Sequence, residues 1–126
     1  MDEKIYIAGP YTNKDNEVVK KNVVKAITVA DQIALLGFKP FVPHLFHYWN
    51  DEFKHDYEFW MEQGSEWLSV CDGLYRIPGE SDGSEREIEQ AKKEDEIPVF
   101  YNIADLLLYF RGSLSDRTTR NINETV

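Results

Sequence analysis

Residues 77–88, IPGESDGSEREI, join a mostly apolar run at residues 73–75 to a charged segment with a helical pattern. A proline and two glycines in this stretch are typical of a turn, so we predict a strand-to-helix turn. The first amides of a helix have no partner within it and can hold an anion. Glu87 lies about one turn into the expected helix, and its side chain should lean back toward the turn.

The pair Ser84 and Glu87 has two interpretations. Ser-x-x-Glu matches a capping box, which would bond Glu87 back to the Ser84 N–H with no cleft beside it. In the other interpretation, the turn is an anion cradle next to a fixed carboxylate. A glycosyl-transferring site for a phosphorylated sugar needs such an arrangement. The pattern alone leaves both interpretations open.

Strands and helices alternate outward from this turn. Strands are predicted at residues 4–8, 39–42, 72–77 and 97–101, and helices at about 16–36, 57–70, 84–94 and 103–110. A strand, a helix and a strand joined by short links form a right-handed parallel unit. The order therefore predicts an α/β fold, a doubly wound parallel sheet of four to five strands with the first strand central. Residues 1–110 would form this single domain, and residues 111–126 a polar C-terminal tail.

The longest predicted helix, at about 16–36, has one apolar face and a well-marked end. Gly37 follows the helical pattern, where glycine readily adopts the left-handed conformation that ends a helix. The face is marked by five residues: Val19, Val23, Ile27, Ala30 and Ala34.

The net charge and the cysteine content of the chain limit which binding partners and which cellular compartment we expect. The net charge is −9, from 23 acidic and 14 basic residues, which argues against nonspecific binding to nucleic acids or anionic membranes. The single cysteine, Cys71, excludes an internal disulfide and fits a reducing compartment. No apolar run approaches the length of a membrane span, and the N-terminus has no signal-peptide pattern. We therefore expect a cytoplasmic protein.

In doubly wound sheets, ligands bind at the carboxyl ends of the strands. Three segments meet at that rim: residues 9–12, 43–49 and 78–87. A dinucleotide-binding Gly-x-Gly-x-x-Gly pattern is absent. Tyr11 lies at the rim, where it stacks on a base or is an ordinary loop aromatic.

Several side chains near the rim have more than one interpretation. The histidines His44, His47 and His55 lack the spacing of a metal site, so we expect packed or substrate-facing side chains and no metal. The aromatic residues between 46 and 60 are core, base-binding or subunit-contact residues. Arg86 faces a phosphate or pairs with Glu85 or Asp82. At the opposite edge of the sheet, Asp72 is expected to cap or bond backbone rather than catalyse.

Four blocks together resemble the nucleoside 2-deoxyribosyltransferase-like superfamily. They are IYIAGPY at residues 5–11, PFVPH at 40–44, Cys71-Asp72, and PGESDG at 78–83 followed by Arg86-Glu87. The similarity covers roughly residues 4–105 and is greatest to a small bacterial and phage branch of that superfamily. Its core is a Ser-x-Gly-x-x-x-Glu motif, here Ser81, Gly83 and Glu87.

The resemblance implies a flavodoxin-like or Rossmann-like fold and cleavage of an N-glycosidic bond. Members either transfer 2-deoxyribose between bases or hydrolyse nucleoside monophosphates, without a metal or organic cofactor. Glu87 then corresponds to the nucleophile, Ser81 to the 5′-phosphate contact, and Tyr11 to the loop near sugar and base. Neighbouring subunits complete the site in this superfamily, so we expect a homodimer or a dimer of dimers. The expected substrate-binding residues are Gly9, Tyr11, His44, Ser81, Gly83, Ser84 and Arg86.

The chain departs from the superfamily at Gly64. The resemblance implies an aspartate about eight residues before Asp72, which orients the substrate or helps to protonate the leaving base. Glu62 and Glu66 lie nearby, but neither occupies the matching position. Glycosidic cleavage with carboxylates normally uses one as nucleophile and another as acid. A nucleotide-binding module without turnover is therefore an alternative, and a structural domain with a capping box is a third.

Overall fold

The computed structural model describes residues 2–112 of the 126-residue chain. The four strands in this part, all parallel, are β1 (Lys4–Ala8), β2 (Lys39–Phe41), β3 (Gly73–Arg76) and β4 (Val99–Phe100). Their order is β2-β1-β3-β4, so β1 is an interior strand, as predicted. This order corresponds to the first four strands of a flavodoxin-like sheet. The fold is α/β and doubly wound.

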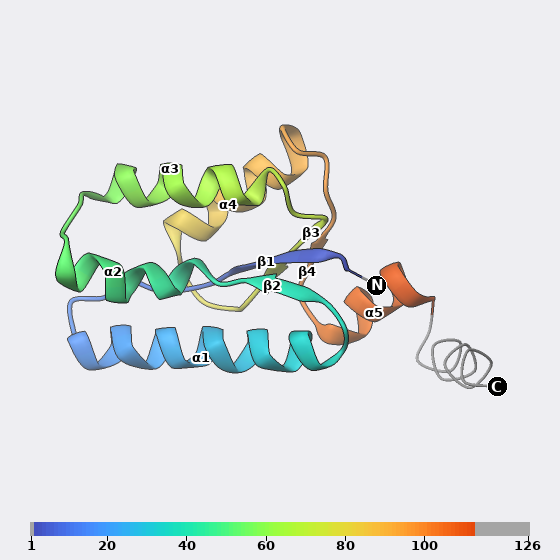
Figure 1. Cartoon of the computed structure of the whole chain (residues 1–126), viewed down its shortest axis with the longest axis horizontal. Coiled ribbons are helices and arrows are strands. Elements are labelled where there is room, and N and C mark those ends of the chain that lie inside the picture. Colours follow the sequence, from blue (N-terminus) through green and yellow to red (C-terminus); the bar gives the residue numbers. More distant parts are fainter. Residues whose placement is uncertain (1, 113–126) are drawn as a thin grey trace.

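Five α-helices and one short 3₁₀ helix connect and cover these strands in the described part of the chain. They are α1 (Asn16–Leu35), η1 (Pro43–Leu45), α2 (Phe46–Glu52), α3 (Tyr57–Leu68), α4 (Asp82–Lys93) and α5 (Ile103–Arg111). Figure 1 shows α1 and α5 on one side of the sheet and α3 and α4 on the other. No helix within residues 2–112 has the length and hydropathy needed to cross a membrane.

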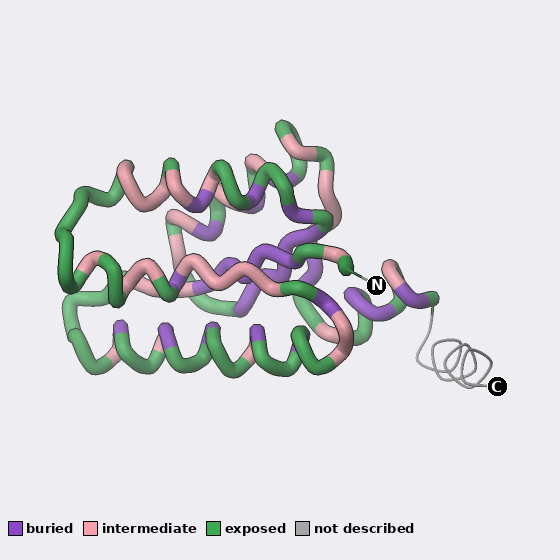
Figure 2. The backbone as a smooth tube through the Cα atoms, in the orientation of Figure 1, coloured by how far each residue is buried: buried purple, intermediate pink, exposed green. Residues whose placement is uncertain are grey.

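Strand β1 supplies both halves of the core. Ile5 and Ile7 pack with α1 and α5, whereas Tyr6 and Ala8 pack with α3 and α4. All four residues are fully buried, and Figure 2 shows buried backbone along the centre of the molecule. Because a strand covered on both faces has no solvent side, it carries a continuous apolar run, here interrupted by one hydroxyl. That hydroxyl belongs to Tyr6.

The apolar face of α1 is rotated from the predicted one. Ile27 and Ala34 are exposed, so the sequence-based assignment of these two residues was wrong. At about 100° per residue, Ile27 and Ala34 lie about 80° and 60° around the helix from Val19, whereas the other buried residues lie within about 40° of it. The end of α1 is as predicted, because Gly37 has a φ of +98°. The buried residues of α1 are Val19, Val23, Ala26, Ala30 and Ile33.

Helix α4 begins earlier than predicted. Ser81 is its N-cap, and the Ser81 hydroxyl accepts a hydrogen bond of 3.1 Å from the Ser84 N–H. The predicted start at Ser84 was wrong because Ser81 already provides a capping side chain three residues upstream. Ser84 therefore lies inside the first turn, and a capping box of Ser84 with Glu87 does not form.

Two polar contacts hold the first residues of the domain in place. Asp72 accepts a hydrogen bond of 2.8 Å from the Lys4 N–H, which is the backbone role expected for it. Arg111, assigned to the tail from the sequence, is the last residue of α5, is buried, and pairs with Glu3 at 2.7 Å. The rest of the predicted tail, after Gly112, lies outside the described residues.

Candidate functional site

A cavity of about 680 Å³ opens at the carboxyl ends of β1 and β3. This is the point where the strand order reverses, and such switch points are where open α/β sheets bind ligands. Its walls come from the loop after β1, from η1 and α2, from α3, and from the first turns of α4. All eight residues predicted for the site line this cavity: Gly9, Tyr11, His44, Ser81, Gly83, Ser84, Arg86 and Glu87.

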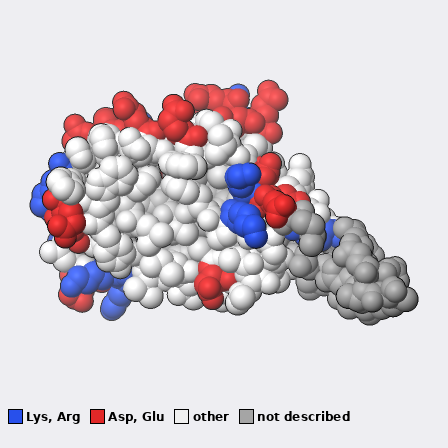
Figure 3. Space-filling view, viewed as in Figure 1, with Lys and Arg blue, Asp and Glu red and all other residues white. Residues whose placement is uncertain are grey.

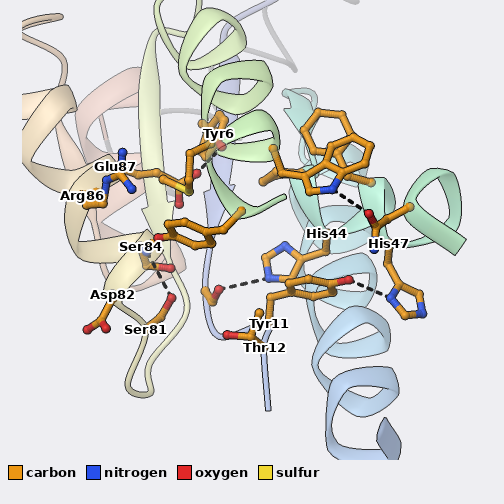
Figure 4. A pocket seen from close by; sticks show the side chains of 18 of the residues that line it. Tyr6, Tyr11, Thr12, His44, His47, Ser81, Asp82, Ser84, Arg86 and Glu87 are labelled. Atoms are coloured by element: carbon orange, nitrogen blue, oxygen red, sulfur yellow. Dashed lines mark hydrogen bonds between the residues drawn. The ribbon is translucent and has the colours of Figure 1, made fainter. Parts of the chain in front are cut away.

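Glu87 and Tyr6 form the innermost pair of the site. Glu87 projects from α4 toward the sheet, and the Tyr6 hydroxyl donates a hydrogen bond to Glu87 Oε2 (Figure 4). A tyrosine buried in an apolar strand needs a partner for its hydroxyl, and Glu87 supplies it. Glu87 thus bonds across the fold to β1 and borders a cavity. The capping-box hypothesis predicted the opposite on both points and is wrong.

Burial controls the ionisation of this pair. Loss of water contact raises the pKa of Glu87 from 4.5 to about 7, although the hydrogen bond from Tyr6 and the charges of Arg76 and Arg86 oppose the shift. The N-terminal half of a helix favours an ionised carboxylate, but desolvation by burial is the largest effect on the pKa of Glu87. Burial and the neighbouring Glu87 charge raise the pKa of Tyr6, so Tyr6 remains a neutral donor at neutral pH.

Gly64, on α3, packs directly against the same pair. A Cβ atom at this position would lie 2.5 Å from Tyr6 Oη and 3.7 Å from Glu87 Oε2. The first distance is a steric overlap, so the Tyr6 hydroxyl occupies the space that a side chain at position 64 would need. The hydroxyl of Tyr6, which bonds to Glu87, therefore fills the space beside position 64.

His44 lines the cavity as a buried side chain with one unused nitrogen. Its Nε2 lies 3.2 Å from the Gly9 carbonyl and 3.1 Å from the Pro10 carbonyl, so Nε2 carries the hydrogen and donates to these oxygens. His44 Nδ1 is buried without a hydrogen-bonding partner among the described residues. Burial lowers the pKa of His44, which keeps the ring neutral and leaves Nδ1 as an acceptor.

Tyr11 and His47 meet at the side of the cavity away from Glu87 (Figure 4). Tyr11 Oη lies 2.8 Å from His47 Nδ1, and His47 Nε2 lies 3.7 Å from a carboxylate oxygen of Asp51. Burial and the charge of Asp51 raise the pKa of Tyr11. From the sequence, the role of His47 was left between packing and substrate contact, and the link to Tyr11 was missed.

The start of α4 is less positive than expected for an anion site. Asp82 lines the cavity and is exposed, and Glu85 also lies in the first turn. Arg86 pairs with Glu58 on α3 at 2.9 Å, so the predicted pairing with Glu85 or Asp82 was wrong. The Ser84 hydroxyl is buried and has no hydrogen-bonding partner within residues 2–112.

Arg76 is a structural residue that the sequence reasoning missed. This last residue of β3 is buried, and its guanidinium donates to the carbonyls of Ile77 and Gly79 and pairs with Glu85 at 3.1 Å. It therefore fixes the turn that leads into α4. A charged residue at the end of an apolar strand was the available signal.

The aromatic residues of α2 and α3 form a stacked wall. Phe46 and Trp60 stack with ring centroids 5.2 Å apart, and Trp60 donates a hydrogen bond of 2.8 Å to Asn50. His55 stacks on Phe59 at 3.8 Å. Across residues 2–112 there is no group of three or more histidine, cysteine, aspartate or glutamate residues arranged to hold a metal ion.

Comparison with known protein families places the whole site inside one domain. A family described as a domain of unknown function (DUF7768) matches residues 3–102. The chain belongs to this family. The DUF7768 match includes all four strands and every residue that lines the cavity. No curated protein matches the chain in a sequence comparison.

Proposed function

We propose that this protein breaks the N-glycosidic bond of nucleosides or nucleoside 5′-monophosphates, with Glu87 as the nucleophile. The observation that carries the proposal is the Tyr6–Glu87 pair at the inner end of an aromatic-walled cavity. A hydrogen bond from a buried neutral tyrosine fixes the orientation of the carboxylate. The resemblance of the Ser81-x-Gly83 and Glu87 motif to the deoxyribosyltransferase-like superfamily supports the same chemistry.

The reaction would take place in two steps. Ionised Glu87 attacks the anomeric carbon, the bond to the base breaks, and a glycosyl ester forms on Glu87. Water then hydrolyses this ester, or a second base accepts the sugar. The hydrophobic wall of Phe46 and Trp60 offers a face for the base, because planar bases stack on aromatic rings.

The charges near α4 favour an uncharged 5′-hydroxyl over a phosphate. Asp82 lines the cavity at the start of the helix, and Glu58 already neutralises Arg86. A phosphate at this place would meet a carboxylate without gaining an unpaired arginine or lysine from the described cavity lining, despite the helix N-terminus. We therefore propose free nucleosides as the preferred substrates. The single free cysteine, Cys71, is buried and supports a cytoplasmic place of action.

A second candidate function is a nucleoside-binding protein without turnover. Gly64 favours it, since the position leaves no room for the acid that the resemblance implies. The two candidates differ in one measurable property, the release of free base.

The test is chromatography of nucleosides and nucleoside monophosphates incubated with purified protein. We expect free base with the wild type and none with Glu87→Gln, which keeps the acceptor for Tyr6 but removes the nucleophile. Glu89→Gln is the matched control, because Glu89 is an exposed residue of the same helix that pairs with Lys93 at 2.8 Å. Binding by the wild type without base release would establish the second candidate instead.

A further inference from the structure

A departing base needs a proton, and Glu87 cannot supply it, because Glu87 must be ionised to attack. We propose that Tyr11 and His47 form the acid that protonates the departing base, with Asp51 behind His47. This inference rests on the proposed function. It replaces the acid missing at Gly64 with residues from the opposite side of the cavity.

The three side chains form a continuous chain of polar contacts. Tyr11 Oη is 2.8 Å from His47 Nδ1, and His47 Nε2 is 3.7 Å from Asp51 Oδ2. His47 and Asp51 are four residues apart on α2, so they share one face of that helix. The Asp51 carboxylate therefore faces Nε2, the ring nitrogen that does not contact Tyr11. Tyr11 and His47 line the cavity, and Glu87 lies across it (Figure 4).

The position of Tyr11 is fixed by its neighbours. Asn22 on α1 donates a hydrogen bond of 3.2 Å to the Tyr11 carbonyl. The ring meets His44 edge-on with centroids 6.1 Å apart, and His47 at 5.7 Å. His44 is in turn held by the carbonyls of Gly9 and Pro10. These contacts hold the Tyr11 hydroxyl in a fixed position, as a catalytic proton donor requires.

Three other polar side chains of the cavity are less suited to this task. His44 uses its Nε2–H on two carbonyls, and its lowered pKa leaves Nδ1 without a proton. His55 is stacked against Phe59 at 3.8 Å. Asp82 is exposed at the start of α4. Tyr11 differs from these three, because its hydroxyl is hydrogen-bonded to an imidazole that can pass it a proton.

Each proton in the relay has a donor and an acceptor. In the charged state, His47 Nε2–H faces Asp51, His47 Nδ1–H donates to Tyr11 Oη, and the Tyr11 proton faces a ring nitrogen of the base. When the glycosidic bond breaks, its electron pair moves to the base, and the base takes the Tyr11 proton. Tyr11 takes the Nδ1 proton, so His47 becomes neutral. In the second step the attacking water, or the N–H of an incoming base, loses a proton that restores His47.

The test uses two leaving groups with one set of variants. An ordinary purine nucleoside needs protonation of its base, whereas an N7-methylated purine nucleoside does not, because its base already carries the positive charge. For Tyr11→Phe and His47→Gln we expect about a 100-fold loss of base release from the ordinary nucleoside. Measured in a single turnover, which reports the first step alone, release from the methylated nucleoside should change by less than about threefold, since no general acid acts on it. Asp51→Asn should give a smaller loss with the same selectivity.

Three controls make the result decisive. Tyr101→Phe, at an exposed tyrosine outside the cavity, should leave both substrates unaffected, and Glu87→Gln should abolish release from both. Thermal melting of each variant shows whether it is folded. Equal losses on both substrates, or no loss on either, would overturn the proton relay while leaving the role of Glu87 intact. Absence of base release from every nucleoside with wild-type protein would overturn the proposed function and the relay together.

Discussion

The hydroxyl of Tyr6 occupies the space next to Gly64, so that a Cβ at position 64 would lie 2.5 Å from Tyr6 Oη. Three segments far apart in sequence therefore share one small volume: β1 through Tyr6, α3 through Gly64 and α4 through Glu87. The backbone of α3 comes this close to β1 because position 64 carries no side chain. A tyrosine in the first strand and a glycine in the third helix are thus complementary.

Substitutions at Gly64 should destabilise the protein and should not create activity. We expect Gly64→Ala to lower the free energy of unfolding by about 1–3 kcal/mol through overpacking, and Gly64→Asp to do the same without raising base release. Urea unfolding measures the first effect and chromatography the second. Tyr6→Phe removes the clashing oxygen, so the double variant Tyr6→Phe, Gly64→Ala should recover part of the loss. A gain of activity in Gly64→Asp would show that Tyr6 has not taken over this space.

Base release should rise with pH through the neutral range. Burial raises the pKa of Glu87 to about 7, and the nucleophile must be ionised, so the active fraction grows as the pH passes that value. An N7-methylated nucleoside isolates this step because its base needs no acid. We expect its kcat/KM to increase about tenfold from pH 6 to pH 8. A flat profile over this range would show that Glu87 is already fully ionised at pH 6.

The variant Glu87→Gln should be more stable than the wild type in mildly alkaline solution. The folded pKa is raised from 4.5 to about 7, so the folded state keeps a proton that the unfolded state has lost. The stability of the wild type therefore falls as the pH rises from 4.5 to about 7 and then levels off. Glu87 is only partly buried, which reduces the effect, and we expect the Glu87→Gln variant to gain about 2 kcal/mol over the wild type between pH 5 and pH 8. Denaturant unfolding at both pH values, with Glu89→Gln as control, measures the difference.

The location of the candidate site could be predicted from the sequence, because the fold fixes where the ends of the strands lie. Parallel strands place their carboxyl ends on one edge, so residues 9–12, 43–49 and 78–87 could be placed together at the cavity. Partners across the fold could not be found this way. Arg86 pairs with Glu58, 28 residues away, whereas the sequence suggested its helical neighbours. The Tyr6–Glu87 contact spans 81 residues and depends on the packing of α4 on β1, which no local spacing encodes.

At the turn into α4, the sequence correctly predicted a capping serine, but we assigned the cap to the wrong one of two serines. Two serines three residues apart, Ser81 and Ser84, both suit a helix start, and Ser-x-x-Glu favoured the second. The structure places the cap on Ser81, which frees Glu87 to face the sheet. The raised pKa of Glu87 could not be predicted either, because the extent of its burial is not visible in a sequence.

We expect the protein to form a homodimer or a higher oligomer through the exposed aromatic surface of α2 and α3. Phe53 is 68% exposed and Trp67 is 51% exposed. The face of the molecule between α1 and α3 in Figure 3 carries few charges, which suits a contact between copies. The double variant Phe53→Ser, Trp67→Ser should dissociate the oligomer, whereas Leu35→Ser, at a more exposed site on α1, should not. Light scattering at tens of micromolar measures the mass; a value near 14.7 kDa for the wild type would refute the prediction.

Free nucleosides should bind more tightly than their 5′-monophosphates. Asp82 lies at the start of α4 beside the cavity, and Glu58 engages Arg86 at 2.9 Å, so a phosphate meets negative charge and no unpaired arginine or lysine among the described lining residues. We expect about a tenfold preference for the nucleoside in competition experiments, equivalent to about 1.4 kcal/mol. Glu58→Gln releases Arg86 and should reduce this preference. Its matched control is Glu17→Gln, which removes an exposed pair with Lys20 on α1 and should leave the preference unchanged. Tighter binding of the monophosphate to the wild type would mean that the α4 amides and the Ser84 hydroxyl outweigh Asp82, and would move the substrate preference to nucleotides.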